Sequence, residues 1–191
     1  MRVIMLSPPG AGKGTQCTRL AEATGVAHIS SGDLLRTEMA QESPIGRAAA
    51  AYAARGDLVP DDLLFELLVP VVLEADRVTG GYLLDGFPRT MAQALRAAEL
   101  GVTHRVGSDA VVHLTAPGPV LVERLLARAG REGRTDDTPE VIQHRLAVFE
   151  AQTRPLVDYY RDRGLLFEVD ADRPADDVQA ELRSLLPMEA S

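Results

Sequence analysis

A glycine-rich segment near the start of the chain contains the residue types that bind phosphate. Residues 7–15 read SPPGAGKGT and lie between an apolar run at 3–6 and a helix-like stretch at 13–24. Glycines let backbone N–H groups turn inward around an anion, and the following helix adds its positive end. Lys13 can then place a charge beside the outer phosphates of a nucleotide, and Thr15 can contact Mg²⁺ directly or through water. The segment therefore predicts a phosphate loop.

A carboxylate follows another apolar run. Asp85 comes directly after residues 82–84, which read YLL. In an α/β protein this position lies at the carboxyl end of a strand, where such sheets place their ligands. A buried carboxylate without a partner is costly. We therefore interpret Asp85 as a group that faces a ligand.

Arginines are concentrated in one part of the second half of the chain. An arginine run is usually a solvated face, but here paired aspartates lie beside it and can hold the arginines in one position or another through ion pairs. The pattern indicates a cationic surface that could contact phosphates. The residues are Arg124, Arg128, Arg131, Arg134 and Arg145, with Asp136 and Asp137.

Short apolar runs that alternate with helix-like stretches predict the framework that positions these residues. Such alternation is typical of buried parallel strands connected by helices. The expected strands are 3–6, 26–29, 82–84, 110–114 and 165–169, and the expected helices include 13–24, 61–75, 91–100, 119–129 and about 175–186. We predict an α/β fold of the P-loop NTPase type, with three α/β/α layers and a five-stranded parallel sheet.

Two stretches depart from this alternation. Residues 30–59 are helical in pattern, with an alanine run, and predict a helical insertion after the second strand. Residues 130–137 are rich in glycine, arginine and aspartate and predict a short mobile loop. After this loop, Thr138 followed by proline is a good helix start, and Pro155 should kink or divide the long helix that follows.

The bulk composition limits the class of protein. A length of 191 residues suits one domain with insertions, and a net charge of -8 argues against nucleic acid as a partner. No apolar run approaches the roughly 20 residues of a membrane span, and the start before the phosphate loop is too short for a signal peptide. We therefore expect no nucleic-acid or membrane partner and a cytoplasmic location.

The single cysteine, Cys17, cannot form a disulfide or a cysteine-rich zinc site within the chain, and we interpret it as a small buried hydrophobe.

Four motifs, in order, resemble those of the nucleoside monophosphate kinases and especially the adenylate kinases. They are 9–16 (PGAGKGTQ), 29–36 (ISSGDLLR), 82–90 (YLLDGFPRT) and the arginines between 124 and 145, and together they cover nearly the whole chain. The resemblance implies the reaction ATP + AMP = 2 ADP, which maintains adenine nucleotide balance, with Mg²⁺ bound as Mg-ATP. It also implies that the substrates are ATP, AMP and ADP and that the chain is a monomer.

The resemblance places ATP on the phosphate loop. Asp85 is similar to the acid that holds the water shell of Mg²⁺ near Thr15. Arg173 lies in a turn whose backbone, in the family, contacts the ATP adenine. The implied ATP-binding residues are Gly10, Ala11, Gly12, Lys13, Gly14, Thr15, Arg128 and Arg173.

The resemblance places AMP against the helical insertion. Two arginines would grip its phosphate, a role suited to the planar, always-charged guanidinium. The hydroxyl of Ser31 would face the adenine, and the amide of Gln93 can donate to one edge atom and accept from the exocyclic amine. The implied AMP-binding residues are Ser31, Arg36, Asp57, Leu58, Val59, Gly86, Phe87, Arg89 and Gln93.

Structural alternatives exist for several of these residues. Ser30 or Ser31 could cap a helix, Arg36 and Gln93 could be exposed helix residues, and 56–60 could be an ordinary helix end.

The arginine-rich motif resembles the lid of the family. Its loop has only about ten residues and contains no cysteine, which is similar to the short-lid form and implies no zinc site. The implied catalytic residues are Lys13, Arg89, Arg124, Arg134 and Arg145, which would converge on the phosphates when the lid closes. The implied domains are a core of 1–29, 60–124 and 138–191, an AMP-binding insertion of 30–59 and a short lid of 125–137.

Two other functions are compatible with parts of this pattern. A kinase for UMP or CMP is one, although relatives with that preference commonly lack the hydroxyl at Ser31 and the amide at Gln93. A nucleotide-dependent switch is the other, but it needs a water-positioning residue and partner-facing loops rather than two arginines around a second phosphate.

Ser7 replaces the usual first glycine of a phosphate loop and Ser31 replaces the threonine of many adenylate kinases. We expect activity to survive the change at Ser31, because the hydroxyl is kept.

Overall fold

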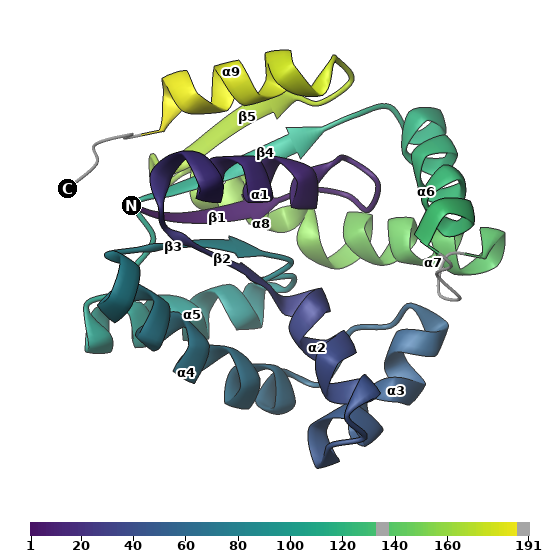
Figure 1. Ribbon diagram of the computed structural model, residues 1–191, viewed down its shortest axis with the longest axis horizontal. Helices are drawn as coiled ribbons and strands as arrows, with labels where there is room; N and C mark the ends of the chain where they lie inside the picture. Colours follow the sequence, from purple (N-terminus) through teal and green to yellow (C-terminus); the bar gives the residue numbers. More distant parts are fainter. Residues whose placement is uncertain (133–137, 187–191) are drawn as a thin grey trace.

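The computed structural model describes residues 1–132 and 138–186, and helices cover both faces of a parallel sheet in it (Figure 1). The sheet has five strands in the order β2-β3-β1-β4-β5, and every neighbouring pair is parallel. The strands are β1 (Arg2–Leu6), β2 (Ala27–Ser30), β3 (Tyr82–Asp85), β4 (Ala110–Thr115) and β5 (Leu166–Asp170). The predicted fold class is confirmed, and each strand end lies within one residue of its predicted position.

The helices also follow the predicted order. The helix predicted at 13–24 matches α1 at both ends. Helices α4 and α5 continue about four residues beyond their predicted ends, and their C-caps are Gly80 and Arg105. Among the described residues, no helix is both long and apolar enough to cross a membrane. The helices are α1 (Lys13–Thr24), α2 (Ser31–Ala40), α3 (Pro44–Arg55), α4 (Asp61–Thr79), α5 (Met91–His104), α6 (Gly118–Glu132), α7 (Pro139–Val148), α8 (Pro155–Arg161) and α9 (Ala175–Leu185).

Alternating side chains of the central strands build two apolar cores. Val3 and Met5 of β1 pack in the core with α1 and α9, whereas Ile4 and Leu6 pack in the core with α4, α5 and α8. Figure 1 shows α1 and α9 on one side of the sheet and α4 and α5 on the other. Because successive side chains of a strand point to opposite faces, a sheet covered on both sides needs the continuous apolar runs seen in the sequence.

The same alternation sets the direction of Asp85. Leu83 of β3 belongs to the core on the α1 side, and Asp85 lies two residues further along the same strand. Asp85 is therefore directed to the face that α1 covers. It is also in register with Met5 of β1 and Ser30 of β2, so it lies at the carboxyl edge of the sheet.

The predicted helical insertion consists of α2 and α3, which are joined by a short turn. Ser30 caps α2 by accepting a hydrogen bond from the Asp33 N–H, and Ser43 caps α3 in the same way through the Gly46 N–H. The two helices approach closely at Gly46, where a Cβ atom would overlap the carbonyl group of Glu38. The insertion is therefore a packed helix pair.

Pro155 divides the long C-terminal helical segment, as predicted. A π-helical turn, η1 (Phe149–Thr153), joins α7 to α8, and the Arg154 N–H donates to the Phe149 carbonyl five residues earlier at 2.9 Å. Proline lacks an N–H for the regular helical bond, which favours a wider turn before it. The turn directs the Thr153 hydroxyl to the carbonyl of Arg89, to which it donates at 2.8 Å.

His113 links the pH to the stability of the fold. Its buried ring stacks on Phe149, and its Nδ1 lies 3.4 Å from Glu168 Oε1. Burial lowers the pKa of His113, Glu168 opposes this shift, and the positive charges of Arg154 and Arg161 add to it. The folded state therefore binds a proton less readily than the unfolded state. The resulting stability is present above the unfolded pKa of about 6.5 and is lost as the pH falls below it.

We expect His113→Gln to reduce the fall in Tm between about pH 7.5 and pH 5.5, as measured by thermal denaturation. His104→Gln is the control, because it makes the same replacement at an exposed position at the end of α5. It should keep the wild-type pH dependence. Identical slopes for the wild type and His113→Gln would contradict this assignment.

Candidate active site

The predicted phosphate loop connects β1 to α1 and depends on two glycines. Gly10 and Gly12 have φ angles of 89° and 85°, in the left-handed region that glycine adopts without strain. A Cβ atom at Gly10 would lie only 2.7 Å from the carbonyl oxygen of Leu121 in α6. Glycine is therefore required both by the turn and by its contact with α6, and the loop places Lys13 at the start of α1.

Lys13 and Asp85 form an ion pair at the carboxyl edge of the sheet. Lys13 Nζ lies 2.8 Å from Asp85 Oδ1, and Asp85 is 6% exposed. Burial alone would raise the pKa of Asp85, but the Lys13 ammonium and the neighbouring His28 outweigh it and hold this pKa well below its usual range. The carboxylate therefore stays ionised beside the loop.

A cavity of about 510 Å³ opens over the phosphate loop. Its walls come from the loop, the ends of β2 and β3, and parts of α2, α6, α7 and α9. It is lined by all the predicted ATP-binding residues and by every predicted catalytic residue except one. These are Gly10, Ala11, Gly12, Lys13, Gly14, Thr15, Arg89, Arg124, Arg128, Arg145 and Arg173. The exception, Arg134, lies outside the described residues, as do Asp136 and Asp137.

A second cavity, of about 100 Å³, lies between the helical insertion and the segment after β3. Nearly all the predicted AMP-binding residues line it, namely Ser31, Arg36, Asp57, Leu58, Val59, Gly86, Arg89 and Gln93. Phe87 does not. Its ring is buried in the apolar core, where its centroid lies 5.2 Å from that of Phe65. The side chain therefore anchors the segment after β3 to the core and does not contact the cavity.

Three arginines line both cavities: Arg36, Arg89 and Arg145. Desolvation is the main cause that lowers the pKa of Arg89, and the positive charges of Arg145 and Arg36 lower it further, against the opposing effect of Asp85. Positive groups that are close enough to disfavour one another's charge become favourable when an anion lies between them. The boundary between the cavities is therefore suited to phosphate groups.

Arg89 is held in place by several contacts that do not use its terminal nitrogens. Its Nε donates to the Gly86 carbonyl at 2.7 Å, and its backbone N–H donates to Gln93 Oε1 at 2.7 Å. Its carbonyl accepts the hydrogen bond from Thr153 described above. Such contacts fix the orientation of the side chain before a ligand binds.

Gln93 is buried, so the alternative that it is an exposed helix residue is wrong. It is 1% exposed, and its Nε2 donates to Asp61 Oδ1 at 2.7 Å while its Oε1 accepts from Arg89. An amide group has two N–H donors and two acceptor sites, so one donor and one acceptor remain for a ligand. The sequence did not predict the contact of Asp61 with Gln93, because an acidic residue after Pro60 is typical of an ordinary helix start.

The other insertion residues have partners within the protein. Ser31 does not cap α2; its hydroxyl donates to the Gly86 carbonyl at 2.9 Å. Arg36 pairs with Asp33, one turn earlier in the same helix, and this partner was also missed. Asp57 lies 2.8 Å from Arg55 Nε and 2.7 Å from His144 Nε2, so it joins the insertion to α7.

Arg124 and Arg173 both contact the turn after β5. Arg124 Nη1 donates to the Ala171 carbonyl at 3.0 Å, and its Nη2 lies 3.7 Å from Asp172. Arg173 Nε donates to the Asp170 carbonyl at 3.0 Å, and its guanidinium pairs with Glu181. These contacts connect α6 and α9 to the rim of the larger cavity.

Comparison with known proteins identifies the family. The sequence model of the family described as "Adenylate kinase" matches residues 5–165. The chain is 46% identical over 184 residues to an adenylate kinase of Stenotrophomonas maltophilia (strain R551-3), covering 95% of this chain and 97% of that protein. It is 44% identical over 185 residues to an adenylate kinase of Kocuria rhizophila, covering 97% and 98%, and 43% identical over 187 residues to one of Cyanothece sp., covering 97% and 94%.

The chain belongs to the adenylate kinase family. It is a nucleoside monophosphate kinase, a phosphotransferase whose reaction is ATP + AMP = 2 ADP, as the sequence motifs predicted.

Gly86 tests how the site depends on backbone geometry. Its φ is 80°, and a Cβ atom there would lie 2.6 Å from Ser31 Oγ and 3.1 Å from Arg89 Nη2. We expect Gly86→Ala to displace both side chains and to lower kcat/KM for AMP by about tenfold or more, with a smaller effect on KM for ATP.

Gly80→Ala is the matched control. Gly80 also has a positive φ, of 70°, at the end of α4, but apart from its chain neighbours no described residue has an atom within 4 Å of the added Cβ. The control therefore carries the same backbone strain without the steric conflict. Equal AMP kinetics for Gly86→Ala and Gly80→Ala would show that the contact is unimportant.

Proposed function

We propose that this chain binds Mg-ATP in the larger cavity and AMP in the smaller one, and transfers the γ-phosphoryl group directly between them. The observation that carries the proposal is the shared boundary, where Arg36, Arg89 and Arg145 line both cavities and Lys13 lines the larger. A protein that only bound one nucleotide would not need a cationic second cavity.

On the donor side, the phosphate loop is proposed to hold the β- and γ-phosphates through its backbone N–H groups and Lys13. The oxygen groups of Thr15 and Asp85 suit Mg²⁺, which prefers oxygen ligands and keeps much of its water shell. The ionised state of Asp85 supports this fit. When bound, Mg²⁺ would neutralise charge on the phosphates, while Lys13 and Asp85 fix the position of the loop.

On the acceptor side, Gln93 and Ser31 are proposed to read the adenine, with Leu58 and Val59 as its apolar wall. The contacts of Gln93 with Asp61 and Arg89 fix its orientation, because its nitrogen must face the carboxylate and its oxygen must face the N–H. The remaining donor and acceptor match adenine, whereas guanine offers the reverse pattern. The backbone around Asp57 and Gly86 would complete this side, and the buried ring of Phe87 would support it from the apolar core.

In the transfer step, an oxygen of the AMP phosphate attacks the γ-phosphorus, and the bond to the β–γ bridging oxygen breaks. No residue needs to act as a nucleophile or base, since the attacking phosphate is already an anion. Arg36 and Arg89 would align this oxygen, and Arg124, Arg128, Arg134 and Arg145 would stabilise the charge on the migrating group. The proposed short lid, 125–137, would close over the site and exclude water.

The proposed domains are a core of 1–29, 60–124 and 138–191 with the insertion 30–59 and the lid. We also propose that the chain is a cytoplasmic monomer that binds no nucleic acid.

A coupled assay tests the reaction and the choice of acceptor. With Mg-ATP as the donor, ADP should form rapidly with AMP and at least about tenfold more slowly with CMP, UMP or GMP. Omission of Mg²⁺ should abolish most of the rate. If CMP or UMP were the preferred acceptor, the adenine-reading roles of Ser31 and Gln93 would be rejected.

Arg89→Ala should lower kcat by roughly 10³-fold, because it removes a charge that contacts the reacting phosphate. Arg77→Ala is the control, since Arg77 is an exposed arginine of α4 that pairs only with Glu74 among the described contacts. It should retain nearly full activity. A fall of less than threefold for Arg89→Ala would reject its proposed role.

A further inference from the structure

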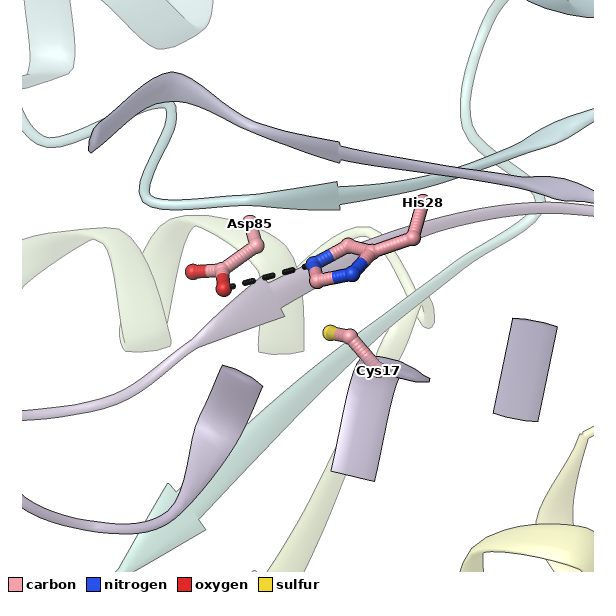
Figure 2. A group of neighbouring side chains, drawn as sticks. All are labelled: Cys17, His28 and Asp85. Atoms are coloured by element: carbon pink, nitrogen blue, oxygen red, sulfur yellow. Dashed lines mark ion pairs between the residues drawn. The ribbon is translucent and has the colours of Figure 1, made fainter. Parts of the chain in front are cut away.

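Three side chains with different ligand atoms meet behind the phosphate loop. Figure 2 shows Cys17, His28 and Asp85 directed toward one another from α1, β2 and β3. One sulfur, one ring nitrogen and one carboxylate oxygen all lie within 4.8 Å of one another. Cys17 is fully buried and His28 is 19% exposed through its side chain, so the cluster is largely closed to solvent.

The spacing of these atoms is close to that of ligands on one metal ion. His28 Nε2 lies 3.5 Å from Asp85 Oδ2. Two ligands of a tetrahedral ion at about 2.0–2.3 Å lie about 3.3–3.8 Å apart. The separation of the imidazole and the carboxylate therefore fits a shared ion, and the Cys17 sulfur lies within 4.8 Å of both.

Among the described residues, the contact of the His28 ring nitrogen with Asp85 is a long one. The 3.5 Å separation from Asp85 is too long for a good hydrogen bond, and Nε2 is buried with no hydrogen-bond partner in the described part of the chain. Buried polar atoms normally have well-formed hydrogen bonds, so a weakly paired nitrogen directed at a thiol and a carboxylate favours a further ligand.

We propose that Cys17, His28 and Asp85 form a binding site for one soft divalent cation, such as Zn²⁺, and that its occupancy inhibits phosphoryl transfer. A sulfur, nitrogen and oxygen donor set suits zinc, whereas Mg²⁺ prefers oxygen alone. The site is thus distinct in chemistry from the proposed Mg²⁺ position. A water molecule would complete a tetrahedral geometry.

The charges of the cluster are compatible with a cation. Cys17 is fully buried, and burial disfavours a thiolate that has no metal ion beside it. A bound dication stabilises the thiolate, and the thiol proton is released to solvent. The ion would therefore exchange for one proton, and the thiolate and the Asp85 carboxylate together would neutralise its two charges.

Inhibition would follow from the double role of Asp85. Its Oδ1 holds Lys13 at 2.8 Å, whereas the proposed ion would engage Oδ2. A cation there would compete with Lys13 for the carboxylate and would remove Asp85 from the shell of the catalytic Mg²⁺. This half of the inference rests on the proposed function, whereas binding of the ion does not.

A titration of the tag-free chain with Cd²⁺ tests the site directly. The chain has only one cysteine, so any thiolate-to-cadmium absorption in the ultraviolet must come from Cys17. We expect one ion per chain with this absorption, none of it for Cys17→Ala, and an affinity at least about tenfold weaker for His28→Gln. His104→Gln, which changes an exposed histidine, should bind as the wild type does.

An activity measurement with Mg-ATP in excess tests the consequence. Zn²⁺ should inhibit the wild type and His104→Gln, whereas Cys17→Ala should need at least about tenfold more zinc for half inhibition. Absence of the thiolate absorption, or an unchanged affinity in His28→Gln, would overturn the site. Binding without inhibition would overturn the regulatory half. Failure of the proposed function can be distinguished from failure of the metal site. If the chain had no kinase activity even without zinc, the cadmium absorption would still report whether the metal site exists.

Discussion

Positive charge gathered at the carboxyl edge of a parallel sheet is the constraint on which this structure depends. The charge of Lys13 is balanced by the buried carboxylate of Asp85. Arg36 and Arg145 lie close enough to Arg89 to lower its pKa. Such a cluster is costly in a desolvated place until an anion enters, and it then binds the anion more strongly than it could in water. The fold therefore has to hold the arginines rigidly and provide space between them.

Several features of the fold meet this requirement. Strand alternation turns Asp85 toward α1, and the π-helical turn before Pro155 directs Thr153 to the backbone of Arg89. Gln93 contacts the same backbone from α5, and the packed pair α2 and α3 brings Arg36 to the boundary between the cavities. The groups that would contact phosphate are thus fixed by a second set of residues, which reduces the rearrangement needed when substrates bind.

The sequence predicted the framework and the residue types of the site, because both depend on local patterns. Apolar runs marked the strands, and the loop at Lys13 and the segment after Asp85 carried enough residues in fixed order to indicate the family. Contacts between distant positions were not predictable in this way. Asp61 and Gln93 are 32 positions apart, Thr153 and Arg89 are 64 apart, and nothing in their spacing indicates that they meet. Cys17 was interpreted as a buried hydrophobe, and its burial agrees, but its position beside His28 and Asp85 appears only in three dimensions.

The central claim is that two phosphate-bearing nucleotides meet across a single cationic boundary. A molecule in which two adenosines are joined by five phosphates would occupy both cavities at once, and calorimetric titration of the chain with it tests this claim most directly. The account predicts one molecule bound per chain, with an affinity about 10²–10⁴-fold higher than that of ATP, because the second nucleotide binds as part of the same molecule. An affinity no higher than that of ATP would contradict it, since the two cavities would then not be joined through the arginines.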